Sequence, residues 1–251
     1  MIIFRAISKL NDPANAQKRD AYQFEQVLTI EHRSSSGKPE RKKEKTYFVK
    51  MQNGWPERHL LRMDGKQVSA EDFAKESARE RRIRDRYIRS GKSSHEKQEQ
   101  VLSVDLARRF DFTLLHTEQS STRPIYKIAF RPKTPALEQK HVADRVLQRM
   151  NGTLWIDGQD FEIQKVEATL SEPVKLLGGL IGALNQMEFH LERIRLNNGA
   201  WFNQRSTVRI SGRKLLETVN LKISETSDKF SEIQSSVIEE RQGEERSPSY
   251  F

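Results

Sequence analysis

The chain has 251 residues, enough for one large β domain or two ordinary ones, and 31% of them are charged. Its longest nearly continuous apolar run, residues 176–184, is far shorter than the roughly 20 residues of a membrane-spanning helix. No cysteine is present, which excludes disulfides, thiolate metal sites and cysteine nucleophiles.

The net charge of +9 leaves nucleic acid or an anionic membrane surface open as partners. The basic residues concentrate in residues 38–45 and 75–97, where acidic residues are interspersed with them. This mixture favours exposed loop and helix surface over a specific polyanion site. No nucleic-acid partner is therefore expected, and peripheral contact with a membrane stays open.

The first 65 residues predict helix followed by strands. Residues 1–20 are expected to form a short helix, interrupted near Pro13. Residues 22–32 alternate between apolar and polar, the pattern of a half-buried strand. Further strands are predicted at 46–52 and 58–64, with turns at Asn53-Gly54 and Asp64-Gly65. No signal peptide is recognisable at the start of the chain.

A charged insertion interrupts the strands at residues 69–105. Ser69 and Asp72 have the spacing of a helix capping box, although Glu or Gln is the usual third residue. The helix should run to about residue 89, largely exposed, with Phe73, Ile83 and Tyr87 as its anchors. A second helical stretch is predicted at 93–106. We expect this insertion to act as a cover within one domain of residues 1–227, followed by a flexible tail at 228–251.

The second half predicts a meander of antiparallel strands. A tight turn with positive φ is expected at Asp157-Gly158, and another turn at Ser211-Gly212. The apolar phase slips near Gln164-Lys165, which predicts a bulge there. A short helix is expected at about 138–150. The predicted strands are 110–117, 124–131, 152–157, 160–171, 185–196, 200–211 and 213–225.

These elements predict a mainly β fold of about ten to eleven antiparallel strands. Such a sheet has one apolar face that must be covered, either by closing into a barrel or by curving around helices. The apolar residues of a strand share one face when they are two positions apart. We expect the following residues to point into the concave side and to bind a ligand: Tyr126, Ile128, Phe130, Leu154, Ile156, Phe161, Met187, Phe189 and Leu191.

No residue pattern indicates catalysis. Glu188, His190 and Glu192 would share one face of a strand, which fits a metal site or simply a polar face, and we favour the latter. The glycine-rich run 178–182 lacks the Lys and Ser/Thr of a phosphate loop. It fits a flexible loop at the mouth of a cavity or a buried connector. The sequence thus predicts no catalytic residue, metal or cofactor.

Three stretches resemble a known family. Residues 126–133 end a strand in Pro-Lys, and Arg145 precedes residues 152–157 (GTLWID) and the strand at 161–166. In this order they resemble the outer-membrane lipoprotein-sorting family, that is, the periplasmic lipoprotein carrier and its relatives. The resemblance covers about residues 106–225 well and 20–65 loosely.

The resemblance implies an unclosed antiparallel barrel, or half-barrel, whose concave face is capped by helices. It also implies a periplasmic protein with a hydrophobic cavity for acyl chains of lipids or lipoproteins, and no catalysis. The first hypothesis is thus a non-enzymatic carrier or binder. The alternatives are an envelope protein–protein interaction module without a transported ligand, and an enzyme built on the same scaffold.

Overall fold

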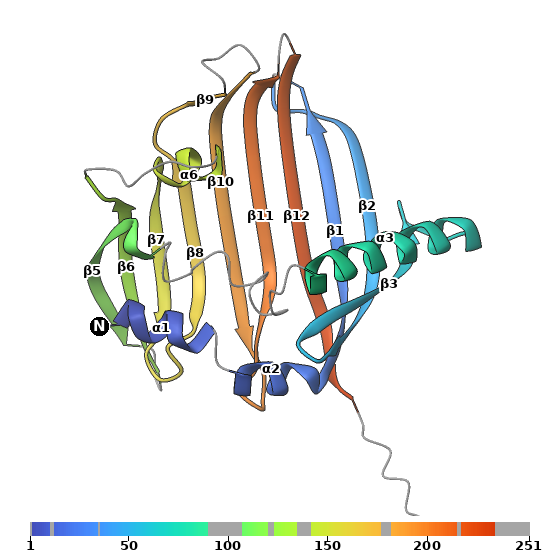
Figure 1. Ribbon diagram of the computed structural model, residues 1–251, viewed down its shortest axis with the longest axis horizontal. Helices are drawn as coiled ribbons and strands as arrows, with labels where there is room; N and C mark the ends of the chain where they lie inside the picture. Colours follow the sequence, from blue (N-terminus) through green and yellow to red (C-terminus); the bar gives the residue numbers. More distant parts are fainter. Residues whose placement is uncertain are drawn as a thin grey trace, which may run out of the picture.

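The computed structural model describes residues 2–10, 13–34, 36–89, 107–119, 123–134, 142–176, 182–214 and 217–233. Strands dominate it (Figure 1). In chain order the elements are α1 (Ile2–Leu10), α2 (Pro13–Asp20), β1 (Tyr22–Arg33), β2 (Pro39–Gln52), β3 (Trp55–Met63), β4 (Lys66–Gln67), α3 (Ala70–Arg89), β5 (Phe110–Gln119), β6 (Pro124–Pro132), α6 (Val142–Leu147), β7 (Met150–Asp157), β8 (Ile163–Leu170), β9 (Val174–Leu176), β10 (Gly182–Arg195), β11 (Trp201–Lys214) and β12 (Glu217–Glu232).

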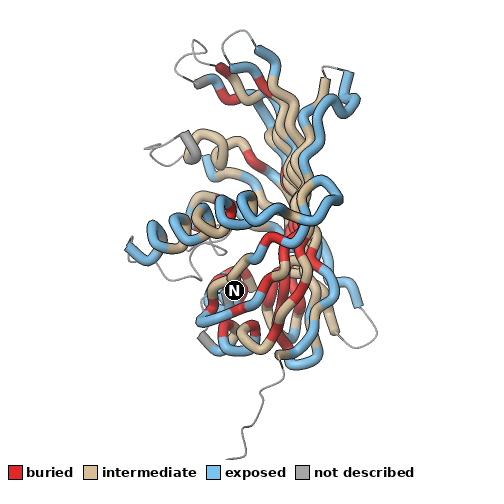
Figure 2. The backbone as a smooth tube through the Cα atoms, turned by 90° about the vertical axis from the view of Figure 1, so that its right-hand side faces the viewer, coloured by how far each residue is buried: buried red, intermediate tan, exposed pale blue. Residues whose placement is uncertain are grey.

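All strands belong to one 12-stranded sheet in the order β4-β3-β2-β1-β12-β11-β10-β8-β7-β6-β5, with β9 paired to β10. Every pairing is antiparallel, as the sequence predicted. The two ends of this order do not pair, so the sheet is an unclosed half-barrel. The sheet curves, and the helices lie on its concave side (Figure 2). This confirms the predicted fold class.

The concave face carries two hydrophobic clusters. In the first, Ile3, Ala6 and Ile7 of α1 pack against the half of the sheet that contains β6, β7 and β8. This arrangement arises because α1 has its apolar residues three and four apart, on one side of the helix. The second cluster lies on β1, β2, β3 and β11, where Phe24 and Phe202 meet edge to face at 5.5 Å.

Two of the four predicted glycine turns have the expected geometry. Asn53 and Gly54 have φ of 52° and 71°, and Asp64 and Gly65 have 52° and 77°, as two-residue hairpin turns require. The tight turn at Asp157-Gly158 is wrong. There the loop is longer, β8 starts at Ile163, and the residue with positive φ is Phe161 at 56°.

A hydrogen-bonding aspartate replaces the tight turn. The Asp157 carboxylate accepts from the backbone N–H groups of Gln159 and Asp160 at 3.0 and 2.7 Å. The Gly158 N–H donates to the Pro124 carbonyl at 2.7 Å. An Asp that bonds to backbone groups ahead of it stabilises a wider turn than its pairing with glycine alone suggests.

The predicted turn at Ser211-Gly212 is also wrong, because both residues lie within β11. Gly212 pairs with Leu184 on one side and Val219 on the other. A Cβ there would lie 2.5 Å from the Ala183 carbonyl oxygen. Glycine is needed at this position for close approach of two backbones, a role that sequence alone does not distinguish from a turn.

Strand β12 continues to Glu232, past the residue 228 at which the sequence suggested a tail. Phe230 explains the extension, since its ring lies 5.0 Å from that of Phe24 and 5.2 Å from that of Phe202. One apolar residue in a polar stretch gives no period in the sequence. Residues 234–251 and the helix predicted at 93–106 lie outside the described residues.

The bulge predicted at Gln164-Lys165 is confirmed. Trp155 pairs with Lys165 whereas Ile156 pairs with Ile163, so Gln164 is the extra residue of β8. Because the bulge adds one residue, the apolar side chains before it and after it both point to the concave face. This explains why the apolar–polar alternation shifts by one position there.

Helix α3 is held by a buried carboxylate that the sequence did not predict. Of the expected apolar anchors, Phe73 is wrong, Ile83 is partly buried, and the side chain of Tyr87 lies outside the described part of the structure. Phe73 is 40% exposed, whereas Glu76 is only 7% exposed. Glu76 accepts hydrogen bonds from Lys45 Nζ at 2.6 Å and from the Tyr47 hydroxyl at 2.9 Å. Arg84 of the same helix pairs with Glu57 of β3 at 2.9 Å. In a helix this rich in charge, ion pairs supply the docking that its narrow apolar stripe cannot.

Candidate functional site

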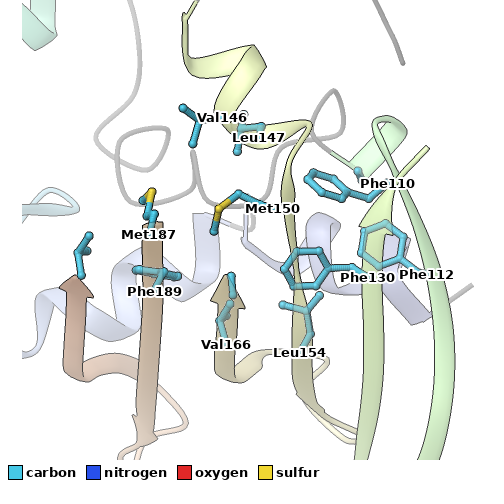
Figure 3. A pocket seen from close by; sticks show the side chains of 13 residues that line it. Phe110, Phe112, Phe130, Val146, Leu147, Met150, Leu154, Val166, Met187 and Phe189 are labelled. Carbon is cyan, nitrogen blue, oxygen red and sulfur yellow. The ribbon is translucent and has the colours of Figure 1, made fainter. Parts of the chain in front are cut away.

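A cavity of about 360 Å³ opens on the concave face, between α6 and the sheet (Figure 3). Its volume falls in the range of small-molecule sites, roughly 300–1,000 Å³. All of its lining residues are apolar. They are Ala107, Phe110, Phe112, Phe130, Val146, Leu147, Met150, Leu154, Val166, Ala168, Met187, Phe189 and Val208.

The register of the sheet brings these side chains together. Residues directly opposite each other in an antiparallel pair point to the same face. Phe112 faces Phe130, and Ala168 of β8 faces Phe189 of β10. Phe189 in turn faces Val208 of β11. The floor of the cavity is therefore a continuous apolar surface spread over several strands.

Helix α6 closes the other side of the cavity. Val146 and Leu147 point from this helix toward the sheet (Figure 3). An ion pair attaches the helix, with Asp144 lying 3.5 Å from Arg109. A short loop connects α6 to β7, and the first residue of β7, Met150, also lines the cavity.

Aromatic rings shape one wall. Phe110 and Phe130 meet edge to face at 5.4 Å, and Phe110 lies 6.4 Å from Phe112. Gly152 sits opposite Phe130 on β7. A Cβ at Gly152 would clash with the Glu167 carbonyl oxygen of β8 and would lie 2.8 Å from Cζ of that ring. The glycine thus leaves the space that the Phe130 side chain occupies.

All nine residues predicted to face the concave side are at least partly buried. Phe130, Leu154, Met187 and Phe189 line the cavity itself. Their role in binding a ligand stays a prediction. The other five belong to the region that α1 covers. Ile128, Ile156 and Leu191 are buried in the first hydrophobic cluster, and Tyr126 packs against it. Phe161 stacks on Tyr126, and Arg5 of α1 lies over the Phe161 ring.

Sequence reasoning missed the remaining lining residues for two reasons. Phe110 and Phe112 are two positions apart in a predicted strand, as Tyr126, Ile128 and Phe130 are in the next, so the sequence pattern does indicate them. Val146 and Leu147, by contrast, depend on where α6 docks, which is set by contacts distant in sequence. Ala168 and Val208 face the cavity only because of the register that the bulge and the long hairpins establish.

A buried polar cluster lies below the cavity, at the junction of α1 and α2 with the loop after β7. Glu162 and Arg193 pair at 2.7 Å, with side chains 3% and 7% exposed. Asn15 Nδ2 donates to the other Glu162 oxygen at 2.7 Å. This contact fixes the start of α2, and with it the end of α1, to the sheet.

Two aspartates extend the cluster. Arg123 Nε donates to Asp157 at 2.6 Å, and Trp201 Nε1 donates to Asp160 at 3.0 Å. Burial by itself would raise the pKa of Asp160, but hydrogen bonds from Trp201, Arg195 and Arg123 outweigh it and lower the pKa to about 2. For Asp157, burial would raise the pKa, but the hydrogen bond from Arg123, the backbone N–H groups of Asp160 and Gln159 and the charge of Arg123 together outweigh it, and the pKa is lowered. Both groups therefore serve as ionised structural anchors at neutral pH.

The acidic residues around His190 occupy a polar face. Glu188 pairs with Arg209 at 3.0 Å and Glu192 with Arg205 at 3.4 Å, across β10 and β11. Within the described ranges, no group of three or more His, Asp or Glu residues is placed to hold a metal ion. None of the helices described there is long and apolar enough to cross a bilayer.

Neither a family model nor a curated protein matches the sequence. Similar solved structures include a LolA superfamily protein from Nitrosomonas europaea, at 11% identity over 93% of each chain with a TM-score of 0.28. A DUF1329 family protein from Desulfovibrio piger has 11% identity over 92% of each chain and a TM-score of 0.30. MucB in complex with MucA(peri) has 11% identity over 92% of this chain and 100% of that one, with a TM-score of 0.23. At these values the likenesses transfer no residue role and no ligand to this chain.

Proposed function

We propose that the protein is a non-enzymatic carrier or binder of acyl chains from lipids or lipoproteins. The observation that carries the proposal is the cavity of about 360 Å³ with thirteen apolar lining residues. A chain of methylene groups satisfies such walls, because it brings no polar group that would be left without a hydrogen bond. The sequence resemblance to the lipoprotein-sorting family supports the same ligand and a periplasmic location.

The energetics suit reversible binding. Each buried methylene contributes about 0.8 kcal/mol, so eight of them contribute roughly 6 kcal/mol before the cost of association is subtracted. This is compatible with loading and release without a chemical step. Among the cavity-lining residues there is no ionisable or nucleophilic side chain, and the proposal accordingly assigns no catalysis.

A second candidate function rests on strand β5. This strand ends the sheet order, and its Leu114 and Leu115 are 50% and 51% exposed. An end strand with exposed apolar side chains can pair with an extended segment of another protein. In this second candidate function, the protein is an interaction module that binds an envelope protein partner at this edge, and it requires no ligand in the cavity.

Uptake of a fluorescent fatty acid tests the first candidate. Phe189→Asp places a charge among the apolar walls and should weaken uptake by roughly tenfold or more, because a charge without a partner in an apolar site costs more than about 1.4 kcal/mol. Arg82→Asp changes an exposed position on α3 and should leave uptake unchanged. If the wild-type protein takes up no apolar probe, the carrier proposal fails and the β5 interaction becomes the better account.

A further inference from the structure

The apolar floor of the cavity continues beyond it across the sheet. Val208, which lines the cavity, faces Ile223 of β12, and Ile223 faces Ile30 of β1. Opposite residues share a face, so these three side chains form one row with Phe189 on the concave side. Ile223 and Ile30 are partly exposed.

A second row runs beside the first. Met187 faces Ile210, and Ile210 faces Leu221. On the other side the surface turns polar, where Ser206 faces Glu225. The apolar strip therefore has a defined border on that side and leads away from the cavity toward β1 and β2.

Two cations stand where the strip ends. On β2, Lys43 faces Ile30, and Arg41 faces His32, the continuation of the second row. Both are exposed, and within the described part of the chain neither has an acidic partner. On the opposite face of the same strand, Lys42 pairs with Glu44 at 2.8 Å. Arg41 and Lys43 thus present two cations on the concave face that have no acidic partner among the described residues.

Two cations on the other side of the cavity already have acidic partners. Arg109 lies 3.5 Å from Asp144, and Arg149 lies 3.7 Å from Glu172. Lys45, the next concave residue of β2, is bound to Glu76 at 2.6 Å. Of these groups, Arg41 and Lys43 are the pair that can receive an anion without losing an existing partner.

We propose that the ligand is a long-chain fatty acid, with its chain in the cavity and along the Phe189–Val208–Ile223–Ile30 row and its carboxylate at Arg41 and Lys43. Four strand spacings separate β10 from β2, which is roughly 19 Å. An extended acyl chain is suited to this span. The inference rests on the proposed function, because the chain must first enter the cavity.

Displacement of an uncharged apolar fluorophore from the full chain tests the inference. Palmitate and hexadecanol have the same chain length and differ in the charge of the head group. Palmitate should bind the wild-type protein more tightly. In the Arg41→Gln/Lys43→Gln variant its affinity should fall roughly 5- to 25-fold, since each exposed ion pair contributes up to about fivefold. Hexadecanol should be unaffected, and Lys42→Gln is the matched control.

The outcomes separate the two proposals. If both ligands bind and the double variant keeps wild-type affinity for palmitate, the head-group site is wrong while the carrier function stands. If the loss for palmitate occurs equally in Lys42→Gln, general surface charge rather than Arg41 and Lys43 is responsible, and the inference is again overturned. If neither the fluorophore nor either ligand binds, the carrier function itself fails, and the inference fails with it.

Discussion

Glu162 and Arg193 form an ion pair of 2.7 Å whose side chains are 3% and 7% exposed. Glu162 also accepts from Asn15 at 2.7 Å. One carboxylate thus connects the α1–α2 junction, the loop after β7 and strand β10. Helix α1 covers the apolar face directly below the cavity, so this pair connects that covering helix to the sheet.

Arg193→Ala should lower the free energy of unfolding by roughly 3–5 kcal/mol, because it leaves the Glu162 charge buried without its partner. Arg205→Ala is the matched control. It removes an arginine whose pair with Glu192 has side chains 63% and 46% exposed, and should cost at most about 1 kcal/mol. Urea unfolding of the three proteins measures both values, and equal losses would show that the buried pair has no special role.

Helix α3 should exchange its amide hydrogens faster than β7 and β8, because it contacts the sheet mainly through β3 and a few ion pairs. Glu76→Ala should increase the exchange of α3 further, since Lys45 and Tyr47 then lose their shared acceptor. Glu71→Ala removes only an exposed pair with Lys75 and should have little effect. Protection of α3 equal to that of β7 and β8 would contradict the expectation.

Acid should destabilise the protein through the cluster below the cavity. The folded-state pKa of Asp160 is lowered to about 2, below the unfolded value of about 3.9. Its stabilising contribution is therefore complete above about pH 4 and is lost as the pH falls toward 2. In thermal melts, Asp160→Asn should have a smaller drop in Tm between pH 5 and pH 3 than the wild type. An identical drop would exclude Asp160 from the acid response.

Much of the architecture follows from short-range patterns. The alternation in residues 22–32 and in the strands after 110 predicted an antiparallel sheet, and the slip in phase at Gln164 predicted its bulge. The Asn53-Gly54 and Asp64-Gly65 turns follow from residues that adopt positive φ. In these places local chemistry and global fold agree.

The errors occur where a distant contact decides the structure. Gly212 permits a close approach to Ala183 instead of a turn, and Phe230 keeps β12 in the sheet by contacting Phe24 and Phe202. Glu76 anchors α3 although a charged residue is normally expected to face water. The upper wall of the cavity, Val146 and Leu147, could not be predicted because it depends on tertiary docking of α6.

The methionines provide the most direct test of the central claim that the cavity binds an acyl chain. Met150 and Met187 line the cavity, whereas Met51 and Met63 belong to the separate cluster on β1, β2 and β3. We predict that titration with a medium-chain fatty alcohol shifts the methyl NMR signals of Met150 and Met187 in protein labelled at the methionine methyl carbons. Those of Met51 and Met63 should stay in place, and Met→Leu variants assign the signals. The account is contradicted if the alcohol is added up to its solubility limit and the signals of Met150 and Met187 do not move. Shifts confined to Met51 and Met63 would contradict it as well.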